Sequence, residues 1–503
     1  MKPTRMLLMP LLAFSLWRCS SVSDTLDFDV IEKSQTRYYF NAESGNDGND
    51  GATPETPFKS LYMLQYANLK PGDSVFLAGG VSHRGAIVLK NISGTKEHPI
   101  VITSYGEPGS LGHIDARGNL AGVLLQNCNH IKIKGIRVTA NGAGGLGDSE
   151  ARTAGMRCGI LCQLTAAGNY SGITIEDTLV EDIYYEEEGF NRPKGDDEGL
   201  YGYGMRIIDD HESATLTDVL VDNCTVQRVS RTGILFTGDT GTLNLRDVEI
   251  RNTTVDNIGG PGIQVSNGTR IHIHHTTINK SGSTADSRNY RRGSGFWCFH
   301  TEQVLFEYNR MTNAFGPADS AGAHIDYNCK DVIYQYNFSA NNWGGFIEIL
   351  GNNYNCCYRY NVSVNDGQRV KGVNGDSQDG HTLWLSKYSG LQIGPFNSYI
   401  YNNTIYVASN KLSCITIEGM ADGVYIANNI FHVLGRSIDK VSKSTNSFME
   451  HNLFASASSW APKNLVDSDP IYGDPQFAKA GGLNLEDYIP QNRELVKDKG
   501  GRF

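Results

Sequence analysis

The segment YIYNNTI (399–405) contains the pattern that decides the fold: alternating apolar residues, an asparagine, and then another apolar residue. The pattern returns downstream as VYIANNI (424–430) and FMEHNLF (448–454), and it begins upstream at VLVDNCTV (219–226). Alternation with a period of two, rich in β-branched residues, is typical of strands rather than helices. The chain is therefore predicted to repeat one short unit of strand, turn and strand.

The spacing of the recurrent asparagine indicates a solenoid. Successive copies lie 29, 23, 34, 28, 24, 42, 26 and 23 residues apart. A minimum near 23 with occasional excess is what one coil plus inserted loops would give. We therefore predict an all-β fold, a single-stranded right-handed parallel β-helix, from about residue 70 to residue 460. The recurrent positions are Asn223, Asn252, His275, Asn309, Asn337, Asn361, Asn403, Asn429 and Asn452.

These asparagines are predicted to be structural rather than catalytic. Asparagine tolerates the left-handed backbone conformation at a bend between strands, and its amide can hydrogen-bond the neighbouring coil.

Composition excludes several classes of protein. The 503 residues are 39% hydrophobic and 19% charged, which suits a large folded core and not a disordered chain. A net charge of −10 argues against a nucleic-acid partner. The ten cysteines contain no CxxC pair, which argues against a zinc site. We expect most of them to be small buried hydrophobic residues.

The first residues have the features of an export signal. Lys2 and Arg5 precede the apolar run Met6–Trp17, as in a signal peptide, and the position of Cys19 resembles that in a bacterial lipoprotein signal. We expect export to the periplasm, the cell surface or the medium, with membrane anchoring by lipidated Cys19 or ordinary cleavage as alternatives. The expected division is a signal over 1–19, a linker over 20–36, an entry and cap segment over 37–80, the β-helix over 81–461 and a tail over 462–503.

Both ends of the chain resemble those of pectate-lyase-like β-helix proteins of bacteria. YYFNAESGNDGNDGATPETPFKSL (38–61) followed by LKPGDSVFLAGG (69–80) is similar to their entry segment, and DPQFAKAGGLNLEDYIPQ (474–491) is similar to their ending. The stretch from Asp319 to Asp366 resembles β-helix glycoside hydrolases of the α-fucosidase and xylanase kind. The resemblance implies the fold and a carbohydrate-active enzyme. It assigns no catalytic residue, because the superfamily holds lyases, hydrolases, esterases and epimerases.

Four long insertions interrupt the repeat, at 141–160, 184–203, 280–294 and 365–380. If each follows the asparagine turn at the same corner of the coil, the four loops wall one groove. Loops on a rigid scaffold are the usual place of function.

The strands after these insertions can be aligned on a glycine, as in Gly233-ILFT, Gly322-AHID and Gly344-GFIE. The first and third residues after the glycine are mostly apolar and should point into the core. The second and fourth should point outward. The predicted outward residues are Arg206, Gln264, Trp297, His324, Asp326, Glu348 and Trp384.

Asp326 and Glu348 are the predicted catalytic pair. This alignment places them in the same outward slot of consecutive coils, which lie about 4.8 Å apart. Glycosidases use two carboxyl groups, about 5–5.5 Å apart in retaining enzymes and about 6.5–9.5 Å apart in inverting ones. Crowding would raise one pKa and leave that group a proton donor. The alternative is two carboxylates on a solvated face.

Further residues are predicted to bind substrate. They are His324, Trp297, Trp384, Arg206 and Gln264 in the outward row, and Arg369, Lys371 and His381 in the last insertion. No cofactor is expected. Ca²⁺ bound by Glu186–Glu188 with Asp196, Asp197 and Glu198 is a minor alternative to a solvated acidic loop.

The predicted function is an exported glycoside hydrolase that cleaves a complex plant or algal polysaccharide, or its oligosaccharides, through the carboxylate pair. One alternative is a polysaccharide lyase that removes a proton from a uronate with Arg369, Lys371 or His381. Another is a non-catalytic carbohydrate-binding solenoid.

Overall fold

The computed structural model of the chain describes residues 36–142, 155–193, 199–387, 392–455 and 462–497. The chain divides into Met1–Gln35 and Thr36–Phe503. The expected signal over 1–19, with Cys19, and the linker up to residue 35 lie outside the described residues, so export stays a prediction. No helix in the described part of the chain has the length and apolar character needed to cross a membrane.

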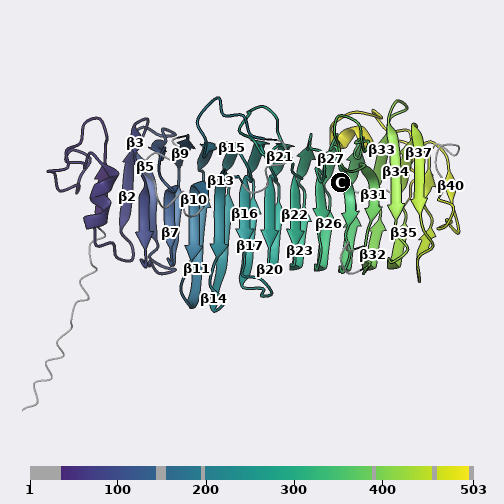
Figure 1. Cartoon of the computed structure of the whole chain (residues 1–503), viewed down its shortest axis with the longest axis horizontal. Helices are drawn as coiled ribbons and strands as arrows, with labels where there is room; N and C mark the ends of the chain where they lie inside the picture. The colour runs from purple at the N-terminus through teal and green to yellow at the C-terminus, as the bar shows by residue number, and fades with distance from the viewer. Residues whose placement is uncertain (1–35, 143–154, 194–198, 388–391, 456–461, 498–503) are drawn as a thin grey trace, which may run out of the picture. The chain divides into compact units, whose positions relative to one another are not determined.

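Residues Thr36–Phe503 form three parallel sheets (Figure 1). From β2 to β39, successive strands of the chain belong to the first, second and third sheet in turn. The first sheet contains β1 (Arg37–Phe40), β2 (Ser74–Ala78), β5 (Ile100–Tyr105), β8 (Ile131–Lys134), β11 (Gly168–Glu176), β14 (Ala214–Asp222), β17 (Leu245–Arg251), β20 (Gly268–His274), β23 (Glu302–Glu307), β26 (Lys330–Gln335), β29 (Tyr354–Arg359), β32 (Phe396–Tyr401), β35 (Asp422–Ala427) and β38 (Phe448–Glu450).

The second sheet contains β3 (Ser82–Arg84), β6 (Gly112–Asp115), β9 (Ile136–Asn141), β12 (Leu179–Tyr184), β15 (Thr225–Val229), β18 (Thr254–Ile258), β21 (Thr277–Ser281), β24 (Arg310–Thr312), β27 (Phe338–Ala340), β30 (Val362–Val364), β33 (Thr404–Val407), β36 (Ile430–Val433), β39 (Leu453–Phe454) and β40 (Ile471–Tyr472). The third contains β4 (Ile87–Lys90), β7 (Ala121–Gln126), β10 (Met156–Leu164), β13 (Tyr201–Asp209), β16 (Ile234–Thr237), β19 (Ile263–Ser266), β22 (Phe296–Phe299), β25 (Ala323–Ile325), β28 (Gly345–Ile349), β31 (His381–Leu385), β34 (Leu412–Ile417) and β37 (Arg436–Val441).

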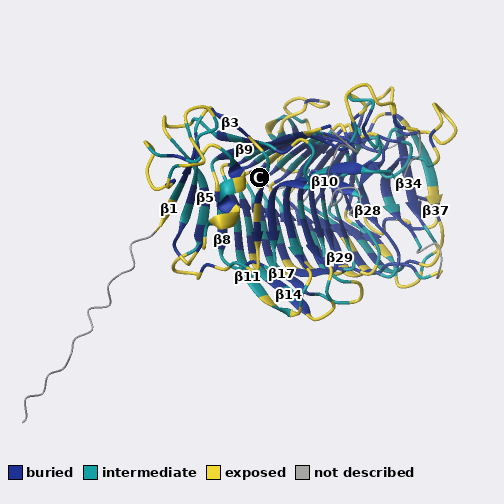
Figure 2. Ribbon diagram, turned by 60° about the vertical axis from the view of Figure 1, so that its left-hand side comes forward, coloured by how far each residue is buried: buried dark blue, intermediate teal, exposed yellow. Residues whose placement is uncertain are grey.

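This arrangement confirms the predicted parallel β-helix. One core of inward-facing residues runs from Phe40 to Leu465 through all three sheets, and burial is greatest along the strands while the loops are exposed (Figure 2). The side chains predicted to point inward, such as Met205, Ile207, Phe296 and Cys298, are fully buried. All nine described cysteines are buried and unpaired, as expected.

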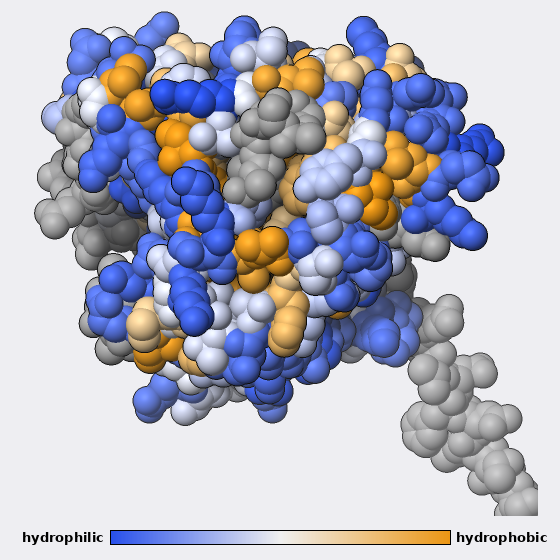
Figure 3. All heavy atoms as spheres, turned by 90° about the vertical axis from the view of Figure 1, so that its right-hand side faces the viewer, coloured by the Kyte–Doolittle hydropathy of each residue, from blue (hydrophilic) through white to orange (hydrophobic). Residues whose placement is uncertain are grey.

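The two ends differ from the coils between them. The entry segment is part of the solenoid, because β1 pairs with β2 at the edge of the first sheet. The 3-10 helix η1 (Leu61–Tyr66) buries Leu61 and Leu64 against the first coils. At the other end, the tail with η2 (Leu485–Tyr488) folds back beside β27 and β33, where Tyr488 packs among Phe338, Val362 and Tyr406. The C-terminal end of the solenoid displays small hydrophobic patches divided by hydrophilic side chains (Figure 3).

The recurrent asparagines occupy two neighbouring positions at the bend between the first and second sheets. Asn223 and Asn252 adopt the left-handed conformation, with φ of 51° each. From Asn309 onward the preceding residue takes that conformation, and the asparagine side chain turns inward. The backbone N–H of Asn337 donates to Oδ1 of Asn361 at 3.0 Å, and the same bond links Asn309, Asn337, Asn361, Asn403, Asn429 and Asn452 in sequence. Their structural role is therefore confirmed.

Replacing one of these buried asparagines should destabilise the fold. In Asn361→Ala, the N–H of Asn337 and the carbonyl of Tyr334 lose their partner inside the core. We expect a loss of about 2–4 kcal/mol in the free energy of unfolding, from the lost hydrogen bonds and two unsatisfied buried groups. Chemical denaturation followed by circular dichroism measures it. The matched control is Asn169→Ala on an exposed position of β11, which should change stability by less than about 0.5 kcal/mol. An equal loss of unfolding free energy in Asn361→Ala and Asn169→Ala would contradict the structural role of the buried asparagines.

Candidate active site

The outer face of the third sheet carries the predicted row of side chains. Arg206 pairs with Leu235, Leu235 with Gln264, Gln264 with Trp297, and Trp297 with His324 on successive strands. Ile325 pairs with Ile349, so His324 lies opposite Glu348, and Glu348 pairs with Trp384. The structure therefore brings the two tryptophans, His324 and Glu348 into one row.

Asp326 lies two residues away from this row, which corrects the predicted slot. The bridge between Ala321 and Gly345 aligns Gly344 with Ser320 and not with Gly322. Phe346 takes the position that glycines 204, 233, 262, 295 and 322 hold in the preceding coils, and its ring is fully buried beside Tyr358. Asp326 and Glu348 are thus diagonal neighbours, with Cα atoms about 8 Å apart by strand geometry instead of about 4.8 Å.

Both carboxyl groups nevertheless line one pocket with a volume of about 660 Å³. Gln264, Trp297, His324, Glu348 and Trp384 contribute its base, and Asp326 and Tyr327 one flank. The loops between the second and third sheets supply the other wall, with Arg231, Pro261, Tyr290, Arg292, Asp319 and Gln378. The sequence analysis predicted all five residues of the base, and it also predicted Asp326.

The four long insertions are on one side of the coil, as predicted. They connect β9 to β10, β12 to β13, β21 to β22 and β30 to β31, so each leaves the second sheet and enters the third. The corner is the one after the second-sheet strand, one strand later than the asparagine turn. Contacts link the described parts of the insertions: Arg288 Nη1 donates to Asn141 Oδ1 at 2.7 Å, and Arg192 Nε donates to the carbonyl of Arg288 at 2.9 Å.

Burial raises the pKa values of the two predicted catalytic acids, Asp326 and Glu348. Loss of solvent, together with the charges of Asp319 and Asp326, raises the pKa of Glu348 to about 8. Burial also raises the pKa of Asp326 to about 7, against the effect of the Tyr327 N–H that donates to its Oδ1 at 2.8 Å. Near neutral pH this pair is therefore protonated to a large extent, and a carboxylic acid in a pocket is a potential proton donor.

Asp319 is the functional candidate that sequence reasoning missed. It lies on the loop before β25 and lines the same pocket. Its Oδ2 accepts a hydrogen bond from Nε of Arg292 at 2.9 Å, and the two side chains form an ion pair. The backbone carbonyl of Asp319 accepts a hydrogen bond from the buried Arg369, which fixes the loop. The only signal in the sequence was its position seven residues before Asp326, and loop conformation cannot be derived from strand alternation.

Two buried tyrosines position the strands that carry the acids. Tyr334 Oη donates to the carbonyl of His324 at 3.0 Å, and Tyr358 Oη lies 3.1 Å from the carbonyls of both Ala323 and Glu348. His324 itself stacks on Trp297, with ring centroids 5.8 Å apart and an interplanar angle of 9°. Burial lowers the pKa of His324 to about 4, so the imidazole is neutral near pH 7.

Four other predicted substrate-binding residues are not brought to the pocket wall. Arg206 stacks over Tyr203, 4.4 Å from the ring centroid, beyond Leu235 in the row. Arg369 is 2% exposed and donates to backbone carbonyls of Gly316, Asp319, Gln378 and Asp379. Lys371 is exposed on its loop. His381 is buried, stacks on Trp384 at 4.4 Å, and has its pKa lowered to about 3 by burial.

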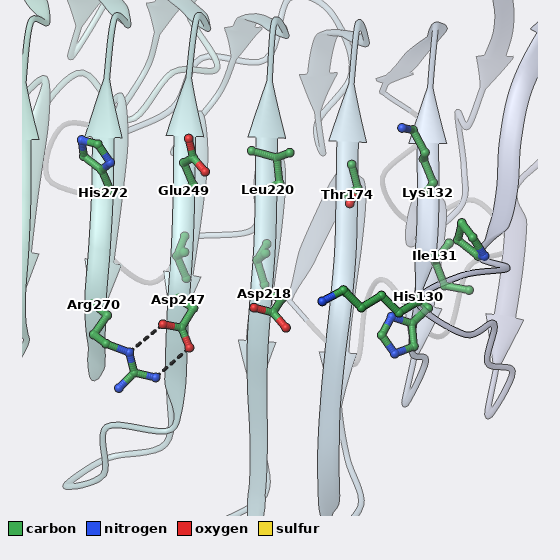
Figure 4. Close-up of a pocket in the computed structure, with 15 residues that line it drawn as sticks. His130, Ile131, Lys132, Thr174, Asp218, Leu220, Asp247, Glu249, Arg270 and His272 are labelled. Carbon is green, nitrogen blue, oxygen red and sulfur yellow. Dashed lines mark hydrogen bonds and ion pairs between the residues drawn. The ribbon is translucent and has the colours of Figure 1, made fainter.

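A second hollow of about 610 Å³ lies on the first sheet, across β8, β11, β14, β17 and β20 (Figure 4). Its carboxylate Asp247 is held by Arg270 through two bonds of 2.6 Å. One row of its side chains runs from Lys132 through Thr174, Leu220 and Glu249 to His272 (Figure 4). The hollow lacks tryptophan, tyrosine and phenylalanine side chains, so the third-sheet pocket is the better candidate for a sugar site.

The pocket can support acid–base chemistry on a glycosidic bond. Glycosidases need one carboxyl group that donates a proton and one ionised carboxylate that attacks or activates water. Asp326 and Glu348 have the first property, and the ion-paired Asp319 supplies the second. Among the described residues, no group of three or more His, Cys, Asp or Glu side chains is arranged to hold a metal ion. Asp196, Asp197 and Glu198, which were considered for Ca²⁺, lie outside the described residues.

Comparison with known proteins agrees with the fold. The family described as "Right handed beta helix region" matches residues 207–405. Lacto-N-biosidase of Bifidobacterium longum subsp. longum is 25% identical over 483 residues, which cover 79% of this chain and 29% of that protein. The chain thus spans less than a third of that relative.

Among solved structures, the GH136 lacto-N-biosidase of Eubacterium ramulus matches with 19% identity. The match covers 87% of this chain and 68% of that one, with TM-scores of 0.57 for the selenomethionine derivative and 0.55 for the native protein. Together with the family match, these likenesses show that the solenoid is a right-handed parallel β-helix.

The raised pKa of Glu348 predicts a pH-dependent cost to stability. The unfolded chain releases the proton near its ordinary pKa of 4.5, whereas the folded chain keeps it until about pH 8. The folded state therefore loses stability as pH rises between these values, on the order of a few kcal/mol. Glu348→Gln should melt at a higher temperature than the wild type at pH 9 and at the same temperature at pH 4. Calorimetry measures both, with the exposed Glu107→Gln as control. A difference that is independent of pH would refute the assignment.

Proposed function

We propose that this right-handed β-helix is a glycoside hydrolase that acts on oligosaccharides and releases a lacto-N-biose unit. The similarity over 79% of the chain to a protein named lacto-N-biosidase supports the substrate class. It favours a disaccharide-releasing glycosidase over the expected degradation of plant or algal polysaccharides. The observation that carries the proposal is the pocket lined by three carboxyl groups, those of Asp319, Asp326 and Glu348, together with Trp297 and Trp384.

The carboxyl groups divide the chemistry between them. Asp326, with a pKa near 7 and a side chain that remains partly exposed, protonates the glycosidic oxygen as the bond to the anomeric carbon breaks. Asp319, paired with Arg292, is the ionised partner that attacks the anomeric carbon or takes a proton from water. Water completes the reaction, and the products are a hemiacetal and an alcohol.

Glu348 is the third acid of the site and an alternative proton donor. It is 8% exposed, and its pKa of about 8 is higher than the pKa of Asp326, which is about 7. The sequence-based pair of Asp326 and Glu348 is diagonal across two coils, and the pKa values of both groups are raised, so Asp319 is the better candidate for the ionised partner. In the pair of Asp319 and Asp326, the ion-paired Asp319 is the carboxylate and Asp326 is the proton donor. Retaining and inverting glycosidases both need this combination.

The base of the pocket is suited to sugar rings. Trp297 and Trp384 present apolar aromatic surface, and Gln264 presents an amide that can donate and accept hydrogen bonds. The lyase alternative has less support, because the bases predicted for it, Arg369, Lys371 and His381, are not among the residues that line the pocket.

Amide variants test the roles of the acids. Asp319→Asn and Asp326→Asn should each lower kcat on an aryl β-lacto-N-bioside by about 10²–10⁴-fold, because each removes a group that acts in the transition state. Release of the aryl group measures the rate. Asp247→Asn, in the hollow of the first sheet, is the matched control and should leave kcat unchanged.

Glu348→Gln separates the two candidate donors. If Glu348 is the donor, Glu348→Gln loses activity as strongly as Asp319→Asn does, whereas Asp326→Asn keeps most of its activity. If Asp326 is the donor, Asp326→Asn loses activity as strongly as Asp319→Asn does, and Glu348→Gln keeps most of its activity. Full activity in all three variants would exclude this pocket as the active site.

A further inference from the structure

A smaller pocket, distinct from the hollow on the first sheet, adjoins the candidate active site and shares two lining residues with it. Its volume is about 480 Å³, and Tyr290 and Arg292 line both pockets. It is built from the loops that leave the second sheet after β21, β24, β27 and β30. We call it the Trp343 pocket, after the largest side chain in its wall.

Aromatic side chains form one wall of the Trp343 pocket and are held in place. Phe315 is 44% exposed and lies against Trp343, with ring centroids 5.5 Å apart and an interplanar angle of 43°. The indole Nε1 of Trp343 donates to Oδ2 of Asp376 at 3.2 Å, and its backbone N–H donates to the carbonyl of Ala314 at 2.8 Å. A fixed, partly exposed aromatic surface loses little conformational freedom when a ligand covers it.

Polar groups surround the aromatic wall. Asp376 is 8% exposed and Asn374, Arg291 and Ser377 lie beside it. An apolar platform with a few convergent hydrogen-bonding groups is the usual composition of a small-ligand site. A pyranose ring matches this composition, because it has an apolar C–H face and hydroxyl groups around its edge.

The junction between the pockets couples them to the proposed chemistry. Arg292 lines both pockets and bonds Asp319 of the active site. Tyr290 lies beside Arg231, whose guanidinium is 4.5 Å from its ring centroid. A chain of sugars can therefore continue from the carboxyl groups across Tyr290 to Trp343 without leaving the protein surface.

We propose that the Trp343 pocket binds a further sugar of the same oligosaccharide, beyond the disaccharide in the active site. The inference rests on the proposed glycosidase function. The active-site pocket, with a volume of about 660 Å³, is in the size range that encloses a drug-sized ligand and can hold a disaccharide. The additional pocket then selects for oligosaccharides longer than the released unit.

Binding to a hydrolysis-deficient protein tests this. In the double variant Asp326→Asn and Glu348→Gln, which lacks both candidate proton donors, calorimetry compares free lacto-N-biose with a tetrasaccharide that carries lacto-N-biose at its non-reducing end. Adding Trp343→Ala should weaken binding of the tetrasaccharide about tenfold, since it removes one stacked ring, and should leave the disaccharide unaffected. Phe448→Ala, a 63% exposed aromatic on β38, is the matched control and should change neither affinity.

The outcomes distinguish the two proposals. Equal weakening of both glycans, or no effect on either, overturns the role of the Trp343 pocket. Failure of the parent to bind either glycan overturns it together with the proposed substrate. Selective weakening of the tetrasaccharide supports the pocket even if the wild type hydrolyses neither glycan, and in that case the glycosidase function alone fails.

Discussion

The structure depends on backbone hydrogen bonding between coils that each contribute one strand to each sheet. Every strand is parallel to its neighbours, and the bends between strands would leave buried N–H and carbonyl groups without partners. At the bend between the first and second sheets, stacked asparagine side chains supply these partners, and we call this stack the asparagine ladder. In the ladder from Asn309 to Asn452, each side chain accepts from the N–H of the preceding coil. At the end of the ladder, Asp467 accepts from Asn452. This fixes the register in which every outward side chain meets its neighbours.

Because the pairing register of the third sheet is fixed, residues about one coil apart in the sequence lie next to one another in a row on its outer face. Trp297, His324, Glu348 and Trp384 are far apart in the chain and adjacent on the third sheet. The same rigidity buries Glu348 between strands and beneath loops, and the loss of solvent raises its pKa. Tyr358 contributes from the core, since its hydroxyl lies within hydrogen-bonding distance of the backbone of both strands that carry the row at this point.

The insertions complete the site because they all leave the coil at one corner. Loops there bring charged groups to the edge of the row. Arg292, on the insertion 280–294, pairs with Asp319 on the loop before β25, and Arg369, on the insertion 365–380, donates to the carbonyl of Asp319. The solenoid thus supplies a rigid base, and the loops supply the reactive and recognising groups. The adjoining Trp343 pocket is made by the same loops, which is why it opens beside the carboxyl groups.

The solenoid, the inward and outward faces of its strands, the common corner of the insertions and most of the row on the third sheet could be predicted from the sequence alone. These features follow from local alternation and from a repeat length, and each coil repeats the same local rules. Tertiary structure alone decided three others. Phe346 takes the position that glycines hold in the preceding coils, and the pairing of β25 with β28 places Glu348 opposite His324 and not opposite Asp326. Arg369 is buried by loop carbonyls instead of facing the substrate. Asp319 reaches the pocket through a loop whose conformation depends on partners distant in sequence, and no local pattern encodes such contacts.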